Sequence, residues 1–461
     1  MASPLESRHG MWSSRWLFIL AAAGSAVGIG NIWKFPYVAG QNGGGAFVII
    51  YLVCVALVGI PIMVSEVMLG REGRSSPITT MRQLVDRGGH NPMWVLIGWM
   101  GVLAGFLILS YYAVIAGWAM NYVMLTVAGT FEGITADAAS TTFDTFLASP
   151  WQLIFWQTAF MVLTIWIVGK GLSRGLENAI RWFMPTLFIL LLVLLGYSIN
   201  SGGFGQAVDF MFSVDVSAFT DPQIWLIAMG QSFFTLSLGM GAMMAYGAYV
   251  PEDAGIGSTV ATIAALDTVV AIAAGLAIFP IVFANGLDAA QGPGLMFVTL
   301  PLAFGQFPLG IVFGTLFFVL VTFAALTSAI SLTEPVLAYL VEEYNAKRKR
   351  VAISVGVLCW ILGLGTVFSF NVWSDVTVVG GLTVFDFIDY VSQNIMLPLG
   401  GLLIAVFAVW KLPKAVMQKQ LGWGRPLLMG GWRIIAGVLA PLGVLAVFVN
   451  ILWPVVQGLI G

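Results

Sequence analysis

Charged residues are scarce in this chain of 461 residues, at 9% of the total, whereas 59% of its residues are hydrophobic. Its apolar runs repeatedly exceed the roughly 20 residues that span a bilayer as a helix. This composition excludes an ordinary water-soluble domain and predicts a chain that crosses a membrane many times. The formal net charge of −2 gives no indication of a nucleic-acid partner.

Histidine and cysteine are also rare, with two residues of each type. His9 and His90 both lie outside the apolar runs, so the histidine of an intramembrane hydrolase is missing. Cys54 and Cys359 both lie inside apolar runs, and we therefore expect no disulfide and interpret them as small packing residues. The sequence predicts that the protein is not an enzyme.

The apolar runs predict an all-α integral membrane protein, a single polytopic unit over residues 1–461 with about eleven transmembrane helices. The first run is too long for a cleavable signal peptide, so we expect it in the mature protein. The expected spans are 13–37, 41–70, 92–126, 151–169, 176–199, 223–249, 255–284, 308–341, 351–369, 384–410 and 433–456.

Basic residues fall on alternate connections between these spans. The other connections, 127–150, 200–222, 285–307 and 370–383, contain no lysine or arginine. Since loops rich in Lys and Arg stay on the cytoplasmic side, the N-terminus is predicted to be cytoplasmic and the C-terminus outside. We expect the protein in the plasma (inner) membrane. Lys34 is the one basic residue that this rule does not explain.

A glycine-rich break interrupts the first span at residues 24–31, with the sequence GSAVGIGN. Unpaired backbone groups cost several kcal/mol each in hydrocarbon, so such a break persists only where protein or a polar ligand satisfies it. A second break, FTLSLGMG, covers residues 234–241 of the sixth span. Interruptions at matching places in two halves are typical of transporters built from inverted repeats. The alternative is that these glycines only let helices pack closely.

The predicted repeats are 13–199 and 223–410, followed by an additional helix at 433–456. An odd number of spans per repeat reverses the topology of the second half. The binding site is then expected near the bilayer midplane, between the first and sixth spans, where helix termini supply partial charges to ions.

Longer motifs around both breaks are similar to those of one family. They are Ser25 to Pro36, Asn42 to Phe47, Gly59 to Glu66, Tyr111-Tyr112, Gln231 to Gly241, and Ala324 to Ser328. Over spans one to ten the chain resembles the neurotransmitter:sodium symporters, in particular their bacterial amino-acid branch, which includes the leucine transporter and an eleven-span carrier of several hydrophobic amino acids. The resemblance implies a leucine-transporter-like fold and sodium-coupled import of amino acids by alternating access.

The resemblance also implies two sodium sites, built from the oxygen ligands that hard cations prefer. The first would use the carbonyls of Gly24, Val27 and Ala324 with the hydroxyls of Thr327 and Ser328. The second would use the Ala26 carbonyl, the Asn31 side chain, Thr235 and Asp267. For Thr327 and Ser328 the alternative is a hydrogen bond back to the preceding helical turn.

Asp267 departs from the leucine transporter, which has asparagine at this position. An acid at membrane depth is a functional candidate by default, the alternative being a protonated structural aspartate. Animal members of the family balance their cations with chloride, held partly by a serine where this chain has Ala271, although Tyr51 and Gln231 of that site are present. We therefore expect that Asp267 supplies the negative charge and that transport is chloride-independent.

For the substrate, helix ends at Gly28 to Gly30 offer N–H groups to a carboxylate, and Tyr112 resembles the family's carboxylate-binding tyrosine. The expected substrate-binding residues are Ala26, Gly28, Gly30, Ile108, Tyr112, Phe234, Thr235, Ser237, Met240, Ser328 and Leu332. Gly28 stands where monoamine carriers have aspartate, which excludes monoamines. The remaining side chains are mostly apolar, and flexible Met240 replaces a phenylalanine. Neutral hydrophobic L-amino acids, large ones included, are the predicted substrates.

Two gates complete the resemblance. Lys34 matches the family's outer arginine, with Asp389 as its partner and Asp386 as a near alternative; lysine lacks the bidentate fork, so a weaker latch is expected. The inner gate would combine Arg8 and Trp12 with Tyr249 and Glu342. His9 stands where the leucine transporter has arginine, and Arg8 has the alternative of being only a positive-inside residue.

Two further acids lie in the spans. Glu66 is expected to accept hydrogen bonds from the broken helices, whereas the sequence suggests no role for Glu334. The expected partners are the lipid bilayer, a small amino acid and two sodium ions, with a monomer or loose dimer as the assembly. A channel is the rival interpretation, and it would not need gates on both sides of the break.

Overall fold

The computed structural model describes residues 10–287, 294–423, 426–446 and 448–450. Within these ranges the regular structure is helical apart from one isolated β-bridge between Thr377 and Thr383. Apolar helices of this kind satisfy their backbone hydrogen bonds internally, as a chain surrounded by lipid must.

The first five predicted spans are each found as a helix or a short series of helical segments. They are α1 (Arg15–Ala26) with η1 (Gly30–Lys34) and α2 (Phe35–Gln41); α3 (Gly45–Cys54) with η2 (Val55–Gly59) and α4 (Ile60–Gly73); η3 (Pro92–Val95) with α6 (Leu96–Val127); α8 (Pro150–Val168); and η4 (Leu172–Glu177) with α9 (Asn178–Ile199).

The later spans follow the same pattern. They are α11 (Pro222–Thr235) with α12 (Ala242–Gly247); α13 (Ile256–Ala284); α15 (Gly310–Tyr344); α16 (Arg348–Ser369); α17 (Val384–Asp389) with η7 (Tyr390–Met396) and α18 (Leu397–Trp410); and α20 (Pro426–Ile434) with η8 (Ile435–Leu439). Residues 447 and 451–456 of the predicted last span lie outside the described ranges.

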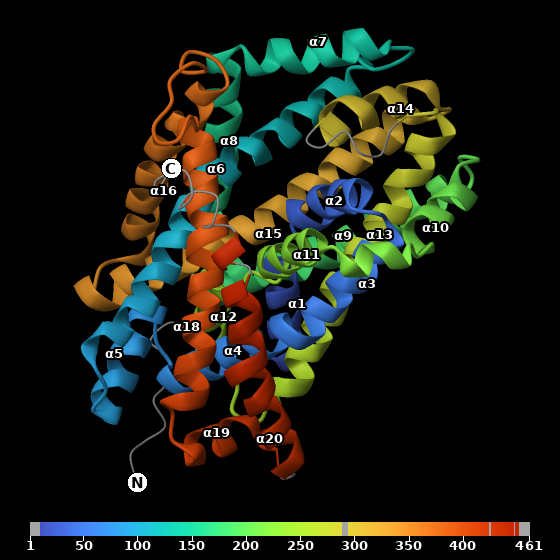
Figure 1. Cartoon of the computed structure of the whole chain (residues 1–461). Coiled ribbons are helices and arrows are strands. Elements are labelled where there is room, and N and C mark those ends of the chain that lie inside the picture. The colour runs from blue at the N-terminus through green and yellow to red at the C-terminus, as the bar shows by residue number, and fades with distance from the viewer. Residues whose placement is uncertain (1–9, 288–293, 424–425, 447, 451–461) are drawn as a thin grey trace.

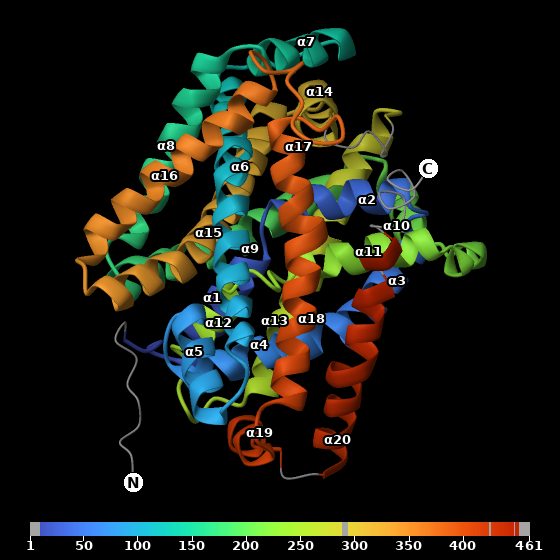
Figure 2. The same ribbon diagram turned by 60° about the vertical axis from the view of Figure 1, so that its left-hand side comes forward.

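Shorter helices connect these spans (Figures 1 and 2). They are α5 (Pro77–Gly88), α7 (Ala136–Leu147), α10 (Phe204–Phe212), η5 (Val216–Thr220), η6 (Leu295–Thr299), α14 (Leu300–Gln306) and α19 (Lys414–Leu421). In both views α7 lies at one end, and α5 and α19 lie at the opposite end.

The number of membrane-crossing helices agrees with the prediction once the broken ones are included. In the described residues nine helices are long and apolar enough to cross a membrane, and the pair formed by residues 15–26 and 30–41, bent by 54°, makes a tenth. The helices α11 and α12, of 14 and 6 residues, are each too short to cross alone. Joined across their break they provide the eleventh span.

The centre of the bundle is formed by α1, α12, α13 and α15, with α6 packed along α15. Val27 of the first break and Leu236 and Leu238 of the second are each 0% exposed. Both breaks are therefore buried in protein rather than exposed to lipid, which is the condition for an unwound segment at membrane depth.

Candidate functional site

The first break separates α1 from η1 over three residues. The α1 helix ends at Ala26, and Val27 adopts an extended conformation with φ −72° and ψ 97°. Gly28 and Ile29 then turn the chain into η1, which begins at Gly30. The N–H groups in the turn have side-chain partners: Gly28 N donates to Asn31 Oδ1 at 3.2 Å, and Ile29 N donates to the Tyr112 hydroxyl at 3.3 Å.

Gly28 is required at this turn because other side chains leave no space beside it. A Cβ atom added at Gly28 would lie 2.5 Å from Ser328 Oγ and 2.9 Å from the Tyr112 hydroxyl. The backbone of the break therefore approaches two of the predicted substrate-binding side chains directly.

The second break lies between α11 and α12. Ser237, Gly239 and Gly241 have left-handed backbone conformations, with φ of 54°, 75° and 73°. Gly239 also packs against the Leu397 carbonyl so closely that a Cβ atom would collide with it. The Gly239 N–H, which has no partner within a helix, is satisfied as predicted. It donates to the buried Glu66 carboxylate, with 2.5 Å between N and Oε1.

Hydroxyl groups join the two breaks. Ser237 Oγ and Ser328 Oγ both donate to the Ser25 carbonyl, at 2.9 and 3.2 Å. Ser25 Oγ donates in turn to Ser331 Oγ at 2.7 Å. Residues from α1, the α11–α12 break and α15 are thus connected through one carbonyl in the last turn of α1.

A small cavity lies beside these bonds. All eleven predicted substrate-binding residues line it, together with Ser25, which is not among those predicted. The space that the centre of a water molecule can occupy in it is about 30 Å³. This is enough for only a few waters. Binding of a larger molecule here requires the surrounding helices or side chains to move outward. That the cavity binds substrate stays a prediction.

The cavity has a polar and an apolar side. Tyr112, Ser237 and Ser328 lie on the side of the broken backbone. Ile108, Phe234, Met240 and Leu332 supply the apolar lining. None of the described lining residues is charged.

Asp267 lies next to the first break and is fully buried. Its Oδ1 accepts from Asn31 Nδ2 at 2.7 Å, and its Oδ2 accepts from Thr235 Oγ1 at 2.6 Å and from the Tyr51 hydroxyl at 3.3 Å. In the described part of the chain no basic side chain forms an ion pair with it. Three neutral donors therefore hold a carboxyl group at membrane depth.

Asn31, whose side-chain oxygen is predicted to bind a cation, presents its nitrogen to Asp267. Its Nδ2 donates to Asp267 and to Thr235 Oγ1, at 2.9 Å for the latter, while its Oδ1 accepts from Gly28 N. The physical reason is that a carboxylate attracts an N–H donor and repels a carbonyl oxygen. Asn31 can offer oxygen to a cation beside Asp267 only after its amide turns over.

The residues of the other predicted cation site lie on facing sides of α1 and α15. Ser328 Oγ reaches the Gly24 carbonyl at 3.5 Å, and a Cβ atom at Gly24 would lie 3.3 Å from Thr327 Cβ. Thr327 Oγ1 donates to the Ala324 carbonyl at 3.0 Å, which is the back-bonded arrangement considered as the alternative. Gly24, Ala324, Thr327 and Ser328 are therefore neighbours, whereas none of the hydrogen bonds between the described residues joins the Val27 carbonyl to them.

The outer gate differs from its predicted form. Lys34 Nζ donates to Gln393 Oε1 at 2.8 Å, and in the described residues it forms no direct ion pair with Asp389. Gln393 Nε2 donates to Asp389 Oδ1 and, at 3.1 Å, to the Tyr111 hydroxyl. Gln393 thus bridges the predicted pair. It stands four residues after Asp389, on the same helical face, which is the signal that could have identified it.

The inner gate places Trp12 against the end of α12. Trp12 is 2% exposed, its backbone N–H donates to the Tyr249 carbonyl at 3.0 Å, and its Nε1 donates to the Tyr246 carbonyl at 3.2 Å. Glu342 accepts from the backbone N–H of Ser76 at 2.9 Å. The predicted Arg8 lies outside the described residues.

Glu334, for which the sequence suggested no role, binds two partners beside this gate. Its Oε1 accepts from the Tyr249 hydroxyl at 2.8 Å and from Arg348 Nη1 at 3.0 Å, and its Oε2 pairs with Arg348 Nη2. Arg348 Nε also donates to the Val168 carbonyl at 3.0 Å. This buried ion pair connects α15, α16 and the end of α8.

The sequence matches the model of the sodium:neurotransmitter symporter family over residues 9–138 and 135–456. An uncharacterized sodium-dependent transporter of Bacillus subtilis, YhdH, is 36% identical over 450 residues, which cover 97% of this chain and 98% of that protein. The human sodium- and chloride-dependent GABA transporter 2 is 25% identical over 437 residues, covering 84% of this chain and 70% of that protein.

The fold is similar to a solved structure as well. The crystal structure of MhsT in complex with L-phenylalanine matches with a TM-score of 0.88 and 43% sequence identity. The match covers 95% of this chain and 99% of that one. The similarity therefore extends over both breaks and both gates rather than over a part of the bundle.

Proposed function

The chain belongs to the sodium:neurotransmitter symporter family, and from this membership we propose that it imports neutral hydrophobic L-amino acids together with sodium. Its relatives are sodium-dependent transporters and not enzymes, and the protein is a sodium-dependent membrane transporter. The substrate class, the number of sodium ions and the independence from chloride are the parts that we propose.

The uncharged cavity with one polar and one apolar side is the observation that carries the substrate proposal. A neutral amino acid matches it: the carboxylate would face the N–H groups of the first break and the Tyr112 hydroxyl, and the side chain would face Ile108, Phe234, Met240 and Leu332. A charged side chain among these apolar groups would lose its hydration without gaining an ionic partner. The complex of MhsT with L-phenylalanine supports an aromatic substrate of this kind.

Two sodium ions are proposed as co-transported substrates. Asp267, Asn31, Thr235 and the Ala26 carbonyl would hold one, with Asp267 as its negative charge. The carbonyls of Gly24, Val27 and Ala324 and the hydroxyls of Thr327 and Ser328 would hold the other. Since both sets include atoms of the break, a bound cation would favour the conformation of the break that also binds the amino acid.

Chloride independence is proposed because a fixed acid already occupies this region. Asp267 Oδ2 accepts from the Tyr51 hydroxyl at 3.3 Å, so one of the groups expected to hold chloride already has an anionic partner. Ala271 is buried and has no hydroxyl to offer. A chloride beside an ionised Asp267 would be repelled.

Transport is proposed to proceed by alternating access between the two gates. The Lys34–Gln393–Asp389 bridge would close the outer path, and Trp12 against Tyr246 and Tyr249 would close the inner one. We propose a plasma-membrane protein with a cytoplasmic N-terminus, acting as a monomer or loose dimer.

The proposal is tested with the purified protein in liposomes that carry an inward sodium gradient. Uptake of labelled leucine is measured in competition with a panel of unlabelled amino acids. We expect leucine, phenylalanine and tryptophan to compete, lysine and glutamate to fail, and uptake to saturate with substrate. Stronger competition by charged amino acids, or a steady sodium current without substrate, would overturn the proposal.

Replacing chloride by gluconate in the same assay tests the anion. Unchanged sodium-driven uptake is the expected result. Loss of uptake in gluconate would show that Asp267 does not replace chloride.

A further inference from the structure

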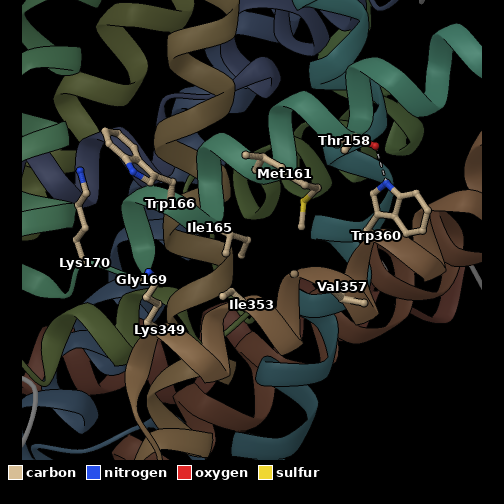
Figure 3. Close-up of a pocket in the computed structure, with 12 residues that line it drawn as sticks. Thr158, Met161, Ile165, Trp166, Gly169, Lys170, Lys349, Ile353, Val357 and Trp360 are labelled. Carbon is tan, nitrogen blue, oxygen red and sulfur yellow. Dashed lines mark hydrogen bonds between the residues drawn. The ribbon is translucent and has the colours of Figure 1, made fainter.

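A groove lies between α8 and α16, at the edge of the molecule and apart from the central cavity (Figures 2 and 3). Its free volume is about 510 Å³. Met161 and Ile165 of α8 and Ile353 and Val357 of α16 line its length. The groove is thus much larger than the central cavity and almost wholly apolar in its walls.

The two helices that form the groove are peripheral. In the most apolar 18-residue segment of each helix, 39% of the residues of α8 and 44% of those of α16 are buried in the protein. Val162 and Trp166 are 63% and 61% exposed, and Val357 is 50% exposed. In a membrane-spanning helix such exposed apolar side chains face lipid, so acyl chains are what surrounds the groove.

The ends of the groove differ in character. At one end Trp360 Nε1 donates to Thr158 Oγ1 at 2.9 Å, a bond between the two helices that Figure 3 shows as a dashed line. At the other end lie Lys170, just after α8, and Lys349, in the first turn of α16. No acidic side chain lines the groove among the described residues.

The two lysines lie where headgroups are expected. The helices approach closely there, since a Cβ atom added at Gly169 would lie 3.9 Å from the Lys349 Cα. Lys170 Nζ lies 3.1 Å from the centre of the Trp166 ring, and tryptophan and lysine are both typical of the membrane interface. Lys349 also stands at a helix N-terminus, which favours an anion.

The length of the groove matches one leaflet. From Thr158 to Val168, its last residue, the α8 axis rises by about 15 Å, at about 1.5 Å per residue. Half of a hydrocarbon core about 30 Å thick is about 15 Å. A chain that begins at headgroup level beside the lysines would therefore end near the Trp360–Thr158 bond, close to the middle of the membrane.

We propose that the α8–α16 groove binds one anionic phospholipid, with an acyl chain along its apolar walls and its phosphate beside Lys170 and Lys349. A second copy of the chain fits less well. It would remove both lysine ammonium groups from water without bringing the phosphate that pairs with them. The proposal rests only on the membrane-spanning fold. It stays valid or fails independently of the transported substrate.

Native mass spectrometry of the full-length protein tests it. The protein is released from mixed micelles holding equal amounts of phosphatidylglycerol and phosphatidylethanolamine with the same acyl chains, and the retained lipid is counted. We expect phosphatidylglycerol to be retained preferentially. Each lysine should contribute roughly fivefold to that preference, so that Lys170→Ala with Lys349→Ala lowers it on the order of 25-fold.

Three variants separate charge, shape and general effects. Lys414→Ala removes an exposed lysine of α19 outside the groove and should leave the preference unchanged. Lys170→Arg with Lys349→Arg keeps both charges and should keep it as well. Val357→Trp should fill the groove and lower the retention of both lipids.

Several results would overturn the proposal. These are equal retention of the two lipids by the wild type, an unchanged preference after removal of both lysines, and displacement of phosphatidylglycerol by inorganic phosphate alone. A Val357→Cys variant that cross-links to a second copy in phosphatidylglycerol micelles would assign the groove to a dimer instead.

Discussion

Asp267 combines two properties that rarely occur together in a membrane protein. It is fully buried, and its described hydrogen-bond partners, Asn31, Thr235 and Tyr51, are all neutral donors. A buried acid paired with Lys or Arg would have its charge neutralised. Because Asp267 has no such partner among the described residues, we propose that it offers its charge to a cation.

Replacing Asp267 by asparagine should therefore weaken sodium binding. A charged partner stabilises an interaction by about 1.5–3 kcal/mol, more than a neutral partner does. We therefore expect the apparent sodium affinity to fall roughly 10- to 100-fold. Sodium titration of labelled-leucine binding measures this. Asp375→Asn, on the exposed connection between α16 and α17, serves as the matched control. An unchanged sodium titration in Asp267→Asn would make this residue a structural aspartate.

Gly28 controls the space in which the carboxylate is proposed to bind. Gly28→Ala places a methyl group 2.5 Å from Ser328 Oγ and 2.9 Å from the Tyr112 hydroxyl. Overpacking of this kind typically costs about 1–3 kcal/mol. We expect leucine binding to weaken by about 5- to 100-fold, measured by equilibrium binding in saturating sodium.

Gly196→Ala is the control for this substitution, since no atom lies within 4 Å of a Cβ added there on α9. It should bind leucine as the wild type does. Equal binding by Gly28→Ala would mean that the substrate lies elsewhere.

The residues that the sequence predicted best are those whose role depends on the backbone. The glycine breaks follow from local sequence, and the cavity lining includes the eleven residues that the resemblance to the family implied, whose role in substrate binding stays a prediction. Side-chain orientation was harder to predict. Asn31 turns its nitrogen to Asp267, and Thr327 bonds within its own helix, because each choice depends on a neighbour distant in the sequence or on a competing local carbonyl.

The helical elements around the gates depend on contacts that no local pattern reveals. Glu334 on α15 pairs with Arg348, which begins α16, and with Tyr249 after α12. From the sequence alone Glu334 was an acid without a partner, since a basic residue in a predicted loop was already explained by topology. The described structure shows Arg348 folded back against Glu334 and the Val168 carbonyl instead.

The Lys34–Gln393 bond of the outer gate connects two helical elements, η1 and η7. Gln393→Leu removes both the acceptor for Lys34 and the donor to Asp389. The two charged groups would then lose their common partner, and we expect bound leucine to dissociate about tenfold faster, in line with the loss of hydrogen bonds to charged groups. Dissociation of labelled leucine in sodium measures it.

Gln152→Leu on the exposed face of α8 is a suitable control. Gln393→Glu, which could pair directly with Lys34, should slow dissociation relative to Gln393→Leu. Equal dissociation rates in all these variants would show that Gln393 is not part of the gate.

At the scale of the whole molecule, transport requires two states that differ in which gate is closed, and a ligand shifts them only if it binds one better than the other. We propose that Trp12 stabilises a closed inner gate, since its ring packs against Tyr246 and Tyr249 with centroid distances of 5.3 and 6.2 Å. Trp12→Ala removes these contacts. The equilibrium between the two states should then shift toward the one with an open inner gate.

A cysteine at Ser331 reports that balance, since Ser331 is 1% exposed and lies one helical turn beyond Ser328 toward the Glu342 end of α15. Both native cysteines, Cys54 and Cys359, are buried, and they are replaced by alanine in this background. We expect sodium to slow labelling of Ser331→Cys by a water-soluble thiol reagent. Adding Trp12→Ala should speed labelling about tenfold and reduce the sodium effect, whereas Trp16→Ala, an exposed tryptophan on α1, should do neither. Because sodium acts only through its preference for one state, labelling that is equally slow with and without Trp12 would show that this side chain does not bias the inner gate.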